Sequence, residues 1–167
     1  MNEDIKKYMP VNTNFANYIK VIFLDLGFQL TLFVRCAVFF RRMKLRLLAV
    51  FFDYLGALLT SCHVSSLAEI GRGIFFPHPA GVVIGDGVVI GDDCTVYQQV
   101  TIGRQTKDND DYPNIGNNVT IYSGAVLIGS IKVGDNAVIA ANSVVTKDVK
   151  AGSVVAGVPA KVIKGTL

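Results

Sequence analysis

The chain has 167 residues, of which 51% are hydrophobic, and its formal net charge is +3. This length suits one domain with a helical preface, and the small net charge gives no argument for a nucleic-acid partner. The three cysteines show neither a metal-ligand spacing nor a disulfide framework, so we expect reduced, buried thiols in a cytoplasmic protein.

Residues 1–62 are predicted to form a helical N-terminal region. Residues 1–14 are polar and are expected to be loose or weakly helical, whereas residues 15–60 are rich in Phe, Leu and Val. The first ten residues mix both charges, and no A-x-A cleavage site follows the apolar run. We therefore expect no secretory signal peptide.

Residues 21–40 are mostly apolar and are followed by the basic residues 41–46. The apolar run is long enough to span a membrane, but Asp25 and Arg35 within it would each cost a few kcal/mol there. Three interpretations stay open: helices packed on each other or on neighbouring subunits, a hairpin lying at the cytoplasmic membrane surface, and a spanning helix. Peripheral membrane contact through residues 15–60 is thus one hypothesis.

A six-residue repeat dominates the rest of the chain. Aliphatic residues recur at every sixth position from Ile84 to Ile102, and again from Ile115 to Val145. A helix has a period of 3.6 and a strand a period of 2, so neither produces this spacing. Hexapeptide repeats are typical of a parallel β-helix. We therefore predict a mainly β protein in which residues 63–167 form a parallel β-helix with the recurring aliphatic side chains inside.

The repeat is interrupted at two places. Ile84 follows Val82 after only two residues, which makes the coil around His78 irregular. Residues 103–114 are polar and add about seven residues to a coil, so we expect a loop extruded from the wall. Long polar loops on a rigid scaffold often carry function.

Histidine is the side chain best suited to proton transfer near neutral pH, and the chain has only His63 and His78. His78 lies between two prolines, which restrict the local backbone. From the residues alone, a turn histidine with a satisfied ring is the favoured interpretation. Two histidines cannot supply the three ligands of a β-helical zinc enzyme, and we predict no metal.

Residues 65–165 resemble the hexapeptide-repeat acyltransferases, which have a left-handed parallel β-helix. The matching motifs are IGRGIFFPHPAGVVIG, VYQQVTIG, AANSVVTKD and AGVPAKVIKG. The resemblance is to the serine acetyltransferase-like enzymes, especially those of surface-polysaccharide biosynthesis. It implies a homotrimer, with acetyl-CoA in grooves between neighbouring β-helices and direct acetyl transfer to an acceptor.

The resemblance also implies roles for individual residues. His78 matches the general base of the family, and His63 is a candidate for assisting it. Small residues would let the pantetheine arm lie flat on the coils, while basic and hydroxyl side chains would meet the cofactor or its phosphates. The implied cofactor-binding residues are Arg104, Ser123, Ala141, Thr146, Lys147 and Lys161.

The chain departs from the serine acetyltransferase pattern at three positions. Tyr112 stands where a second active-site histidine precedes the loop proline, Pro77 replaces an acidic residue, and His63 aligns roughly with another. Free serine needs charged groups for both of its ends, so we expect the acceptor to be a sugar hydroxyl of a surface polysaccharide or its precursor. Serine O-acetylation in cysteine biosynthesis is the alternative. A sugar-amine acceptor and a non-catalytic scaffold trimer also stay open.

Acetyl-CoA is a cytosolic metabolite, so the active site should face the cytoplasm. We therefore expect a cytoplasmic protein, with the inner face of the cytoplasmic membrane as the site of any lipid contact.

Overall fold

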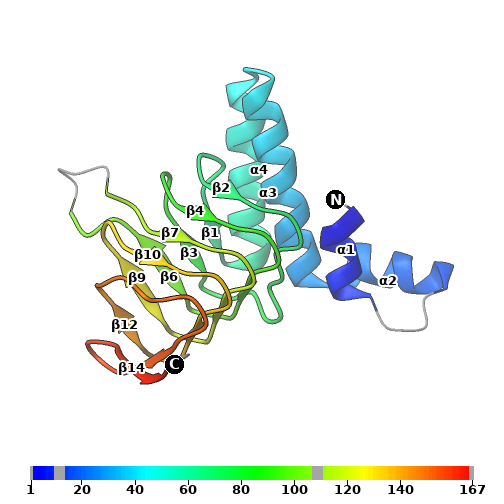
Figure 1. The fold of residues 1–167 in the computed structure, drawn as a ribbon. Coiled ribbons are helices and arrows are strands. Elements are labelled where there is room, and N and C mark those ends of the chain that lie inside the picture. Colours follow the sequence, from blue (N-terminus) through cyan, green and yellow to red (C-terminus); the bar gives the residue numbers. More distant parts are fainter. Residues whose placement is uncertain (1, 10–13, 107–110, 166–167) are drawn as a thin grey trace.

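The computed structural model describes residues 2–9, 14–106 and 111–165. A helical region leads into a β-helix, and α3 and α4 stand side by side as a hairpin at its first coils (Figure 1). The helices are α1 (Asn2–Tyr8), α2 (Phe15–Leu24), α3 (Leu26–Arg42) and α4 (Arg46–Thr60). Of the two expectations for the start of the chain, loose or weakly helical, residues 2–8 form a helix, and α1 buries Asp4 completely against α3 and the first coil.

Asp25 separates α2 from α3. Its extended backbone ends α2, and its side chain caps α3 by accepting the Phe28 N–H at 3.0 Å. The two helices meet at an angle of 75°. Within the described ranges no single helix is both long and apolar enough to cross a membrane, and only the bent α2–α3 pair meets that test of length and composition.

The strands of the described residues form three sheets that wrap around one core, and every pairing is parallel except that of β13 with β14. Sheet A contains β1 (His63–Val64), β3 (Val83–Ile84), β6 (Thr101–Gly103), β9 (Val126–Ile128) and β12 (Val144–Val145). Sheet B contains β2 (Glu69–Ile70), β4 (Val89–Ile90), β7 (Asn114–Ile115) and β10 (Lys132–Val133). Sheet C contains β5 (Thr95–Val96), β8 (Thr120–Ile121), β11 (Val138–Ile139), β13 (Val154–Ala156) and β14 (Lys161–Lys164). The fold is the predicted left-handed parallel β-helix.

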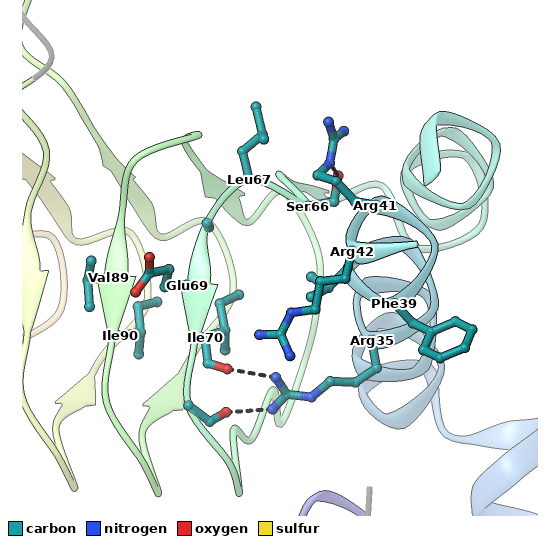
Figure 2. A pocket seen from close by; sticks show the side chains of 13 residues that line it. Arg35, Phe39, Arg41, Arg42, Ser66, Leu67, Glu69, Ile70, Val89 and Ile90 are labelled. Atoms are coloured by element: carbon teal, nitrogen blue, oxygen red, sulfur yellow. Dashed lines mark hydrogen bonds between the residues drawn. The ribbon is translucent and has the colours of Figure 1, made fainter. Parts of the chain in front are cut away.

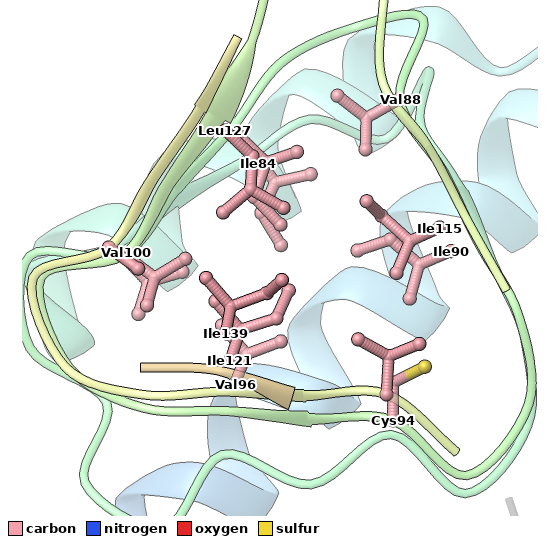
Figure 3. Packing of buried hydrophobic residues seen from close by; sticks show 14 of the residues in the cluster. Ile84, Val88, Ile90, Cys94, Val96, Val100, Ile115, Ile121, Leu127 and Ile139 are labelled. Atoms are coloured by element: carbon pink, nitrogen blue, oxygen red, sulfur yellow. The ribbon is translucent and has the colours of Figure 1, made fainter. Parts of the chain in front are cut away.

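The core of the β-helix is the predicted aliphatic ladder. Each recurring position from Ile84 to Val145 is at most 2% exposed. Figure 3 shows several of these side chains, among them Ile84, Ile115 and Ile139, pointing into the space that the coils enclose. A second buried series lies two residues before each recurring position, and it includes Val88, Cys94 and Ala125. This series is not evident from the sequence, because its members are small and chemically mixed. Two inward side chains per face exclude water from the core.

The strand register locates the irregular coil. Val64 pairs with Ile84, twenty positions later, whereas Ile84 pairs with Ile102, eighteen positions later. Phe75 also bridges to a residue twenty positions later, so the two extra residues lie between Phe75 and Val83, at the corner that carries His78. The predicted loop 103–114 includes residues 107–110, which are outside the described residues.

Candidate functional site

His78 lines a pocket of about 440 Å³ between the first corner of the β-helix and the junction of α2 with α3. The histidine is exposed, so a substrate can reach its imidazole from solvent. The coil side of the pocket consists of Pro77, His78, Pro79, Ala80 and Gln98, and the helix side consists of Leu24, Asp25, Leu26 and Gly27.

The segment before His78 is held by α1 and α3. Phe76 donates its N–H to the Tyr8 hydroxyl at 2.9 Å, and the same hydroxyl is 3.0 Å from Thr31 Oγ1. Burial raises the pKa of Tyr8 to about 12, so the phenol keeps its proton at neutral pH. Gly27 lets α3 approach closely, because a Cβ there would overlap the Phe76 carbonyl oxygen. These contacts fix the backbone that leads into His78.

Two polar side chains that the sequence analysis missed face the same pocket. Asp25 contributes a carboxylate from the helical region, although one oxygen is engaged in capping α3. Gln98 contributes an amide oxygen, Oε1, that is buried and has no hydrogen-bond partner among the described residues. A buried acceptor without a partner calls for an explanation. The pocket therefore brings the His78 imidazole together with a carboxylate and an amide side chain.

The corner between sheets C and A runs from His78 along the β-helix, and we call it the reactive edge. Backbone hydrogen bonds of 2.8 to 3.0 Å connect its successive coils, linking Ala80 to Gln99, Gln98 to Gly124 and Ser123 to Asn142. The structure thus places two predicted cofactor-binding residues, Ser123 and Ala141, on the same edge as His78. Ser123 is half-buried and Ala141 is exposed, and both side chains are small, as expected of residues beneath an extended pantetheine arm. Lys161 is exposed at the start of β14, beyond the far end of the edge.

The other predicted residues lie away from the His78 pocket. Arg104, Thr146 and Lys147 are at the opposite corner, between sheets A and B, where Arg104 lies 5.9 Å from the Tyr112 ring centroid. His63 is exposed at the start of β1 in sheet A and does not line the pocket. Across the described ranges, no cluster of three or more His, Cys, Asp or Glu side chains is placed to hold a metal ion.

Tyr112 has a packing role in the structure. Its ring covers the corner at Gly85 and Gly87, and a Cβ at Gly87 would overlap it. The ring also packs against the edge of the apolar core. Tyr112 therefore closes the wall of its own β-helix.

A second pocket, of about 750 Å³, lies between α3 and sheet B (Figure 2). Arg35 crosses it and donates to the Ile70 and Gly71 carbonyl oxygens and to Asp4. Burial by itself raises the pKa of Asp4, but the hydrogen bonds and charge of Arg35 outweigh it, so the pKa is lowered. The predicted site residues do not line this pocket. Its ion pair joins α1, α3 and the first coil.

Three comparisons agree on the relatives of this chain. Residues 112–147 match the family model described as bacterial transferase hexapeptide (six repeats). The chain is 36% identical over 148 residues to a serine acetyltransferase of Synechococcus elongatus, which aligns 88% of this chain with 61% of that protein. It is 37% identical over 164 residues to a serine acetyltransferase of Bacillus pumilus, aligning 98% of this chain with 76% of the relative.

A solved serine acetyltransferase of Brucella abortus in complex with coenzyme A has the same fold. Its TM-score is 0.89 at 29% identity, and the match covers 99% of this chain and 67% of that chain. The chain therefore spans about three fifths to three quarters of the length of these proteins.

These relatives correct one expectation and support another. The assignment to the polysaccharide branch, with a sugar acceptor, is wrong, because the relatives found by sequence and by structure are serine acetyltransferases. The expected membership of the hexapeptide-repeat transferases is confirmed, and one solved relative holds coenzyme A. With 37% identity over 98% of its length to a relative of which it covers 76%, the chain belongs to the serine acetyltransferase family.

Proposed function

We propose that this chain transfers the acetyl group of acetyl-CoA to the hydroxyl of L-serine, the reaction named for its relatives, and so serves cysteine biosynthesis. The observation that carries the proposal is the His78 pocket, in which a base, a carboxylate and an unpaired amide oxygen converge. The departures at Pro77 and Tyr112 argued against an amino-acid acceptor. Asp25 removes this objection, because its carboxylate supplies a negative charge to the pocket from the helical region.

In this mechanism the serine ammonium lies against Asp25 and Gln98 Oε1, in charge-assisted hydrogen bonds. This contact directs the serine hydroxyl toward His78. The imidazole removes the hydroxyl proton as the oxygen attacks the thioester carbonyl carbon. The carbon–sulfur bond then breaks, and the imidazolium returns its proton to the leaving thiolate. The products are O-acetylserine and coenzyme A.

Acetyl-CoA supplies the activated acetyl group as a cosubstrate. Ser123 and Ala141 would lie under its pantetheine arm on the reactive edge, and Lys161 beyond the end of that edge would face its phosphates as a point charge. Arg104, Thr146 and Lys147 lie on the other corner of sheet A, so one chain cannot present both corners to one cofactor. We infer a homotrimer, in which the reactive edge of one subunit meets the opposite corner of its neighbour.

The test measures thiol release from acetyl-CoA with L-serine as acceptor, for the wild type and His78→Ala. General-base catalysis is worth about 10²–10⁴-fold, so we expect at least a hundredfold loss of turnover number. Glu69→Gln, an exposed change on sheet B, is the control and should retain wild-type turnover. A His78→Ala variant that keeps more than about a tenth of the activity would overturn the base assignment. A wild-type protein inactive toward serine would overturn the proposed reaction.

A further inference from the structure

Helix α4 buries small side chains and exposes large apolar ones, whereas an ordinary amphipathic helix buries its large apolar side chains. The side chains that it buries are small, namely Ala49, Gly56 and Thr60. Large apolar side chains lie on the opposite face, at the spacing i, i+4, i+7 and i+11 of a single helical stripe. This outer stripe consists of Leu47, Phe51, Tyr54 and Leu58, which are 87%, 56%, 75% and 70% exposed.

The packed side of the hairpin is already complete. Phe40 of α3 stacks on Phe52 of α4 with ring centroids 5.3 Å apart, and Gly56 sits against Phe33. The outer stripe therefore has no role in joining the two helices. Contiguous apolar surface of this kind marks a surface that binds a partner or a membrane.

The turn of the hairpin adds positive charge to the same surface. Lys44 and Arg46 are exposed, and their side chains form no hydrogen bond or ion pair with any described residue. Residues 43–52 contain no Asp or Glu, and the next carboxylate, Asp53, is bound by Ser66 and Arg41. Met43 precedes Lys44 and is 54% exposed, and Leu45 lies between the two cations and is 44% exposed. The turn thus presents apolar and cationic side chains together.

The charge of this surface selects between its potential occupants. A second copy docked through the same surface would offer another apolar stripe and two more cations, but no carboxylate from residues 43–52. An anionic lipid surface offers both an apolar interior and phosphate oxygens, and it attracts each nearby Lys or Arg with about 1 kcal/mol. Lys and Arg at such a boundary extend toward the headgroups while apolar neighbours enter the acyl region.

The position of the turn is compatible with catalysis. Leu26, at the start of α3, lines the His78 pocket, and the turn follows Arg42 at the other end of the helix. Seventeen helical residues span about 25 Å. Figure 1 shows the α3–α4 hairpin rising beyond the coils, with its turn at the end away from the β-helix. A surface that holds the turn therefore leaves the pocket open.

We propose that the α3–α4 turn and the outer stripe of α4 dock on an anionic lipid bilayer. Leu47, Phe51, Tyr54 and Leu58 enter the boundary of the acyl chains, and Lys44 and Arg46 bind headgroup phosphates. The contact is peripheral, as for amphipathic helices that lie in the membrane interface. It places the enzyme at a membrane surface independently of which acceptor it uses.

The experiment uses a tryptophan as a reporter of depth, because the chain has none of its own. Phe51→Trp is titrated with vesicles of phosphatidylcholine alone and of phosphatidylcholine mixed with phosphatidylserine. The expected result is a blue shift of the emission, and quenching by lipids brominated on their acyl chains, with the anionic vesicles. Lys44→Gln/Arg46→Gln in this background should weaken binding about 25-fold, since each cation contributes about fivefold. Leu47→Ser/Leu58→Ser should abolish the blue shift.

The matched control is Lys132→Gln/Lys150→Gln, which removes two exposed lysines far from the hairpin and should leave vesicle binding unchanged. Equal weakening by this control would overturn the proposal, because charge anywhere on the protein would then explain binding. Absence of a blue shift with anionic vesicles would overturn it too. So would a Leu47→Ser/Leu58→Ser protein that loses self-association in sedimentation but still binds vesicles, since the stripe would then bind a second copy.

Discussion

At the scale of single residues, Asp25 has a structural task and a proposed chemical one. One oxygen caps α3, and the residue also faces the pocket that contains His78. A carboxylate with both roles explains why the helical region, and not only the β-helix, belongs to the proposed site. Its two tasks can be separated by substitution, because asparagine caps helices as well as aspartate does but carries no charge.

We expect Asp25→Asn to raise the KM for L-serine at least tenfold while leaving the melting temperature within a few degrees. A hydrogen bond to a charged group contributes about 1.5–3 kcal/mol, which corresponds to this change in binding. The comparison substrate is 3-hydroxypropionate, which lacks the ammonium group and should react equally slowly with both proteins. An unchanged KM for serine, in a variant that still turns serine over, would remove Asp25 from the site without affecting the role of His78.

Asp4 provides a prediction about pH. Burial raises the pKa of Asp4, but the hydrogen bonds and the positive charge of Arg35 together contribute to a net shift below the ordinary value of 3.8 in the folded protein. Its stabilising contribution is therefore complete above about pH 4 and is lost as the pH falls through the lowered folded pKa. Asp4→Asn should reduce the free energy of unfolding at pH 7 and show a smaller further loss on acidification than the wild type. Urea denaturation between neutral and acid pH measures this, with exposed Asp148→Asn keeping the wild-type slope.

At the scale of elements, the decisive contact is that of α3 with the segment before His78. Gly27 belongs to the first turn of α3 and touches the Phe76 carbonyl, two residues before the base. Glycine is a poor helix former, and alanine is ordinarily better by about 1 kcal/mol. Its presence here is explained by the close approach of α3 to the coil.

Gly27→Ala should therefore destabilise the protein by about 1–3 kcal/mol, against the helix propensity, because the added methyl group forces α3 away from the coil. Thermal or urea unfolding measures this. Gly103→Ala is the matched control, since no atom lies within 4 Å of the Cβ that it would add, and it should change stability by less than about 0.5 kcal/mol. A stabilised Gly27→Ala protein would show that the coil can move aside.

At the scale of the whole molecule, the sequence was sufficient for the β-helix because each coil repeats the same physical requirement. One buried aliphatic residue per face makes the period visible, as Ile84, Ile90 and Val96 show. Asp25 was not predictable in this way, since it lies 53 positions before His78 and only the packing of α3 on the first coil joins them. The acceptor was misjudged for the same reason. The absence of an acidic residue at Pro77 and of a histidine at Tyr112 is visible in the local sequence, whereas the carboxylate that Asp25 is proposed to supply instead comes from a distant helix.

The small side chains proposed to lie beneath the cosubstrate on the reactive edge predict how the whole protein responds to coenzyme A. Coenzyme A at a hundred times its Kd should stabilise the folded state by about 2.7 kcal/mol, visible as a rise in melting temperature. Ala141→Phe should remove that rise by filling the edge, while the unliganded protein keeps its own melting temperature. Lys132→Phe adds the same bulk on the exposed face of sheet B and should retain the full rise. If Ala141→Phe responds like this control, the cofactor does not lie along the reactive edge.

The extra residues of the first coil have a consequence for how such a protein can diversify. They are confined to one corner, and the strands on either side keep their parallel register with the next coil. A corner can therefore gain or lose residues without shifting the apolar ladder, because the strands on either side of it keep their length and register. The acceptor end of the reactive edge, at His78, can thus change independently of the stretch proposed to bind the cosubstrate, at Ser123 and Ala141. New acceptor chemistry can arise at the first while the second stays as it is.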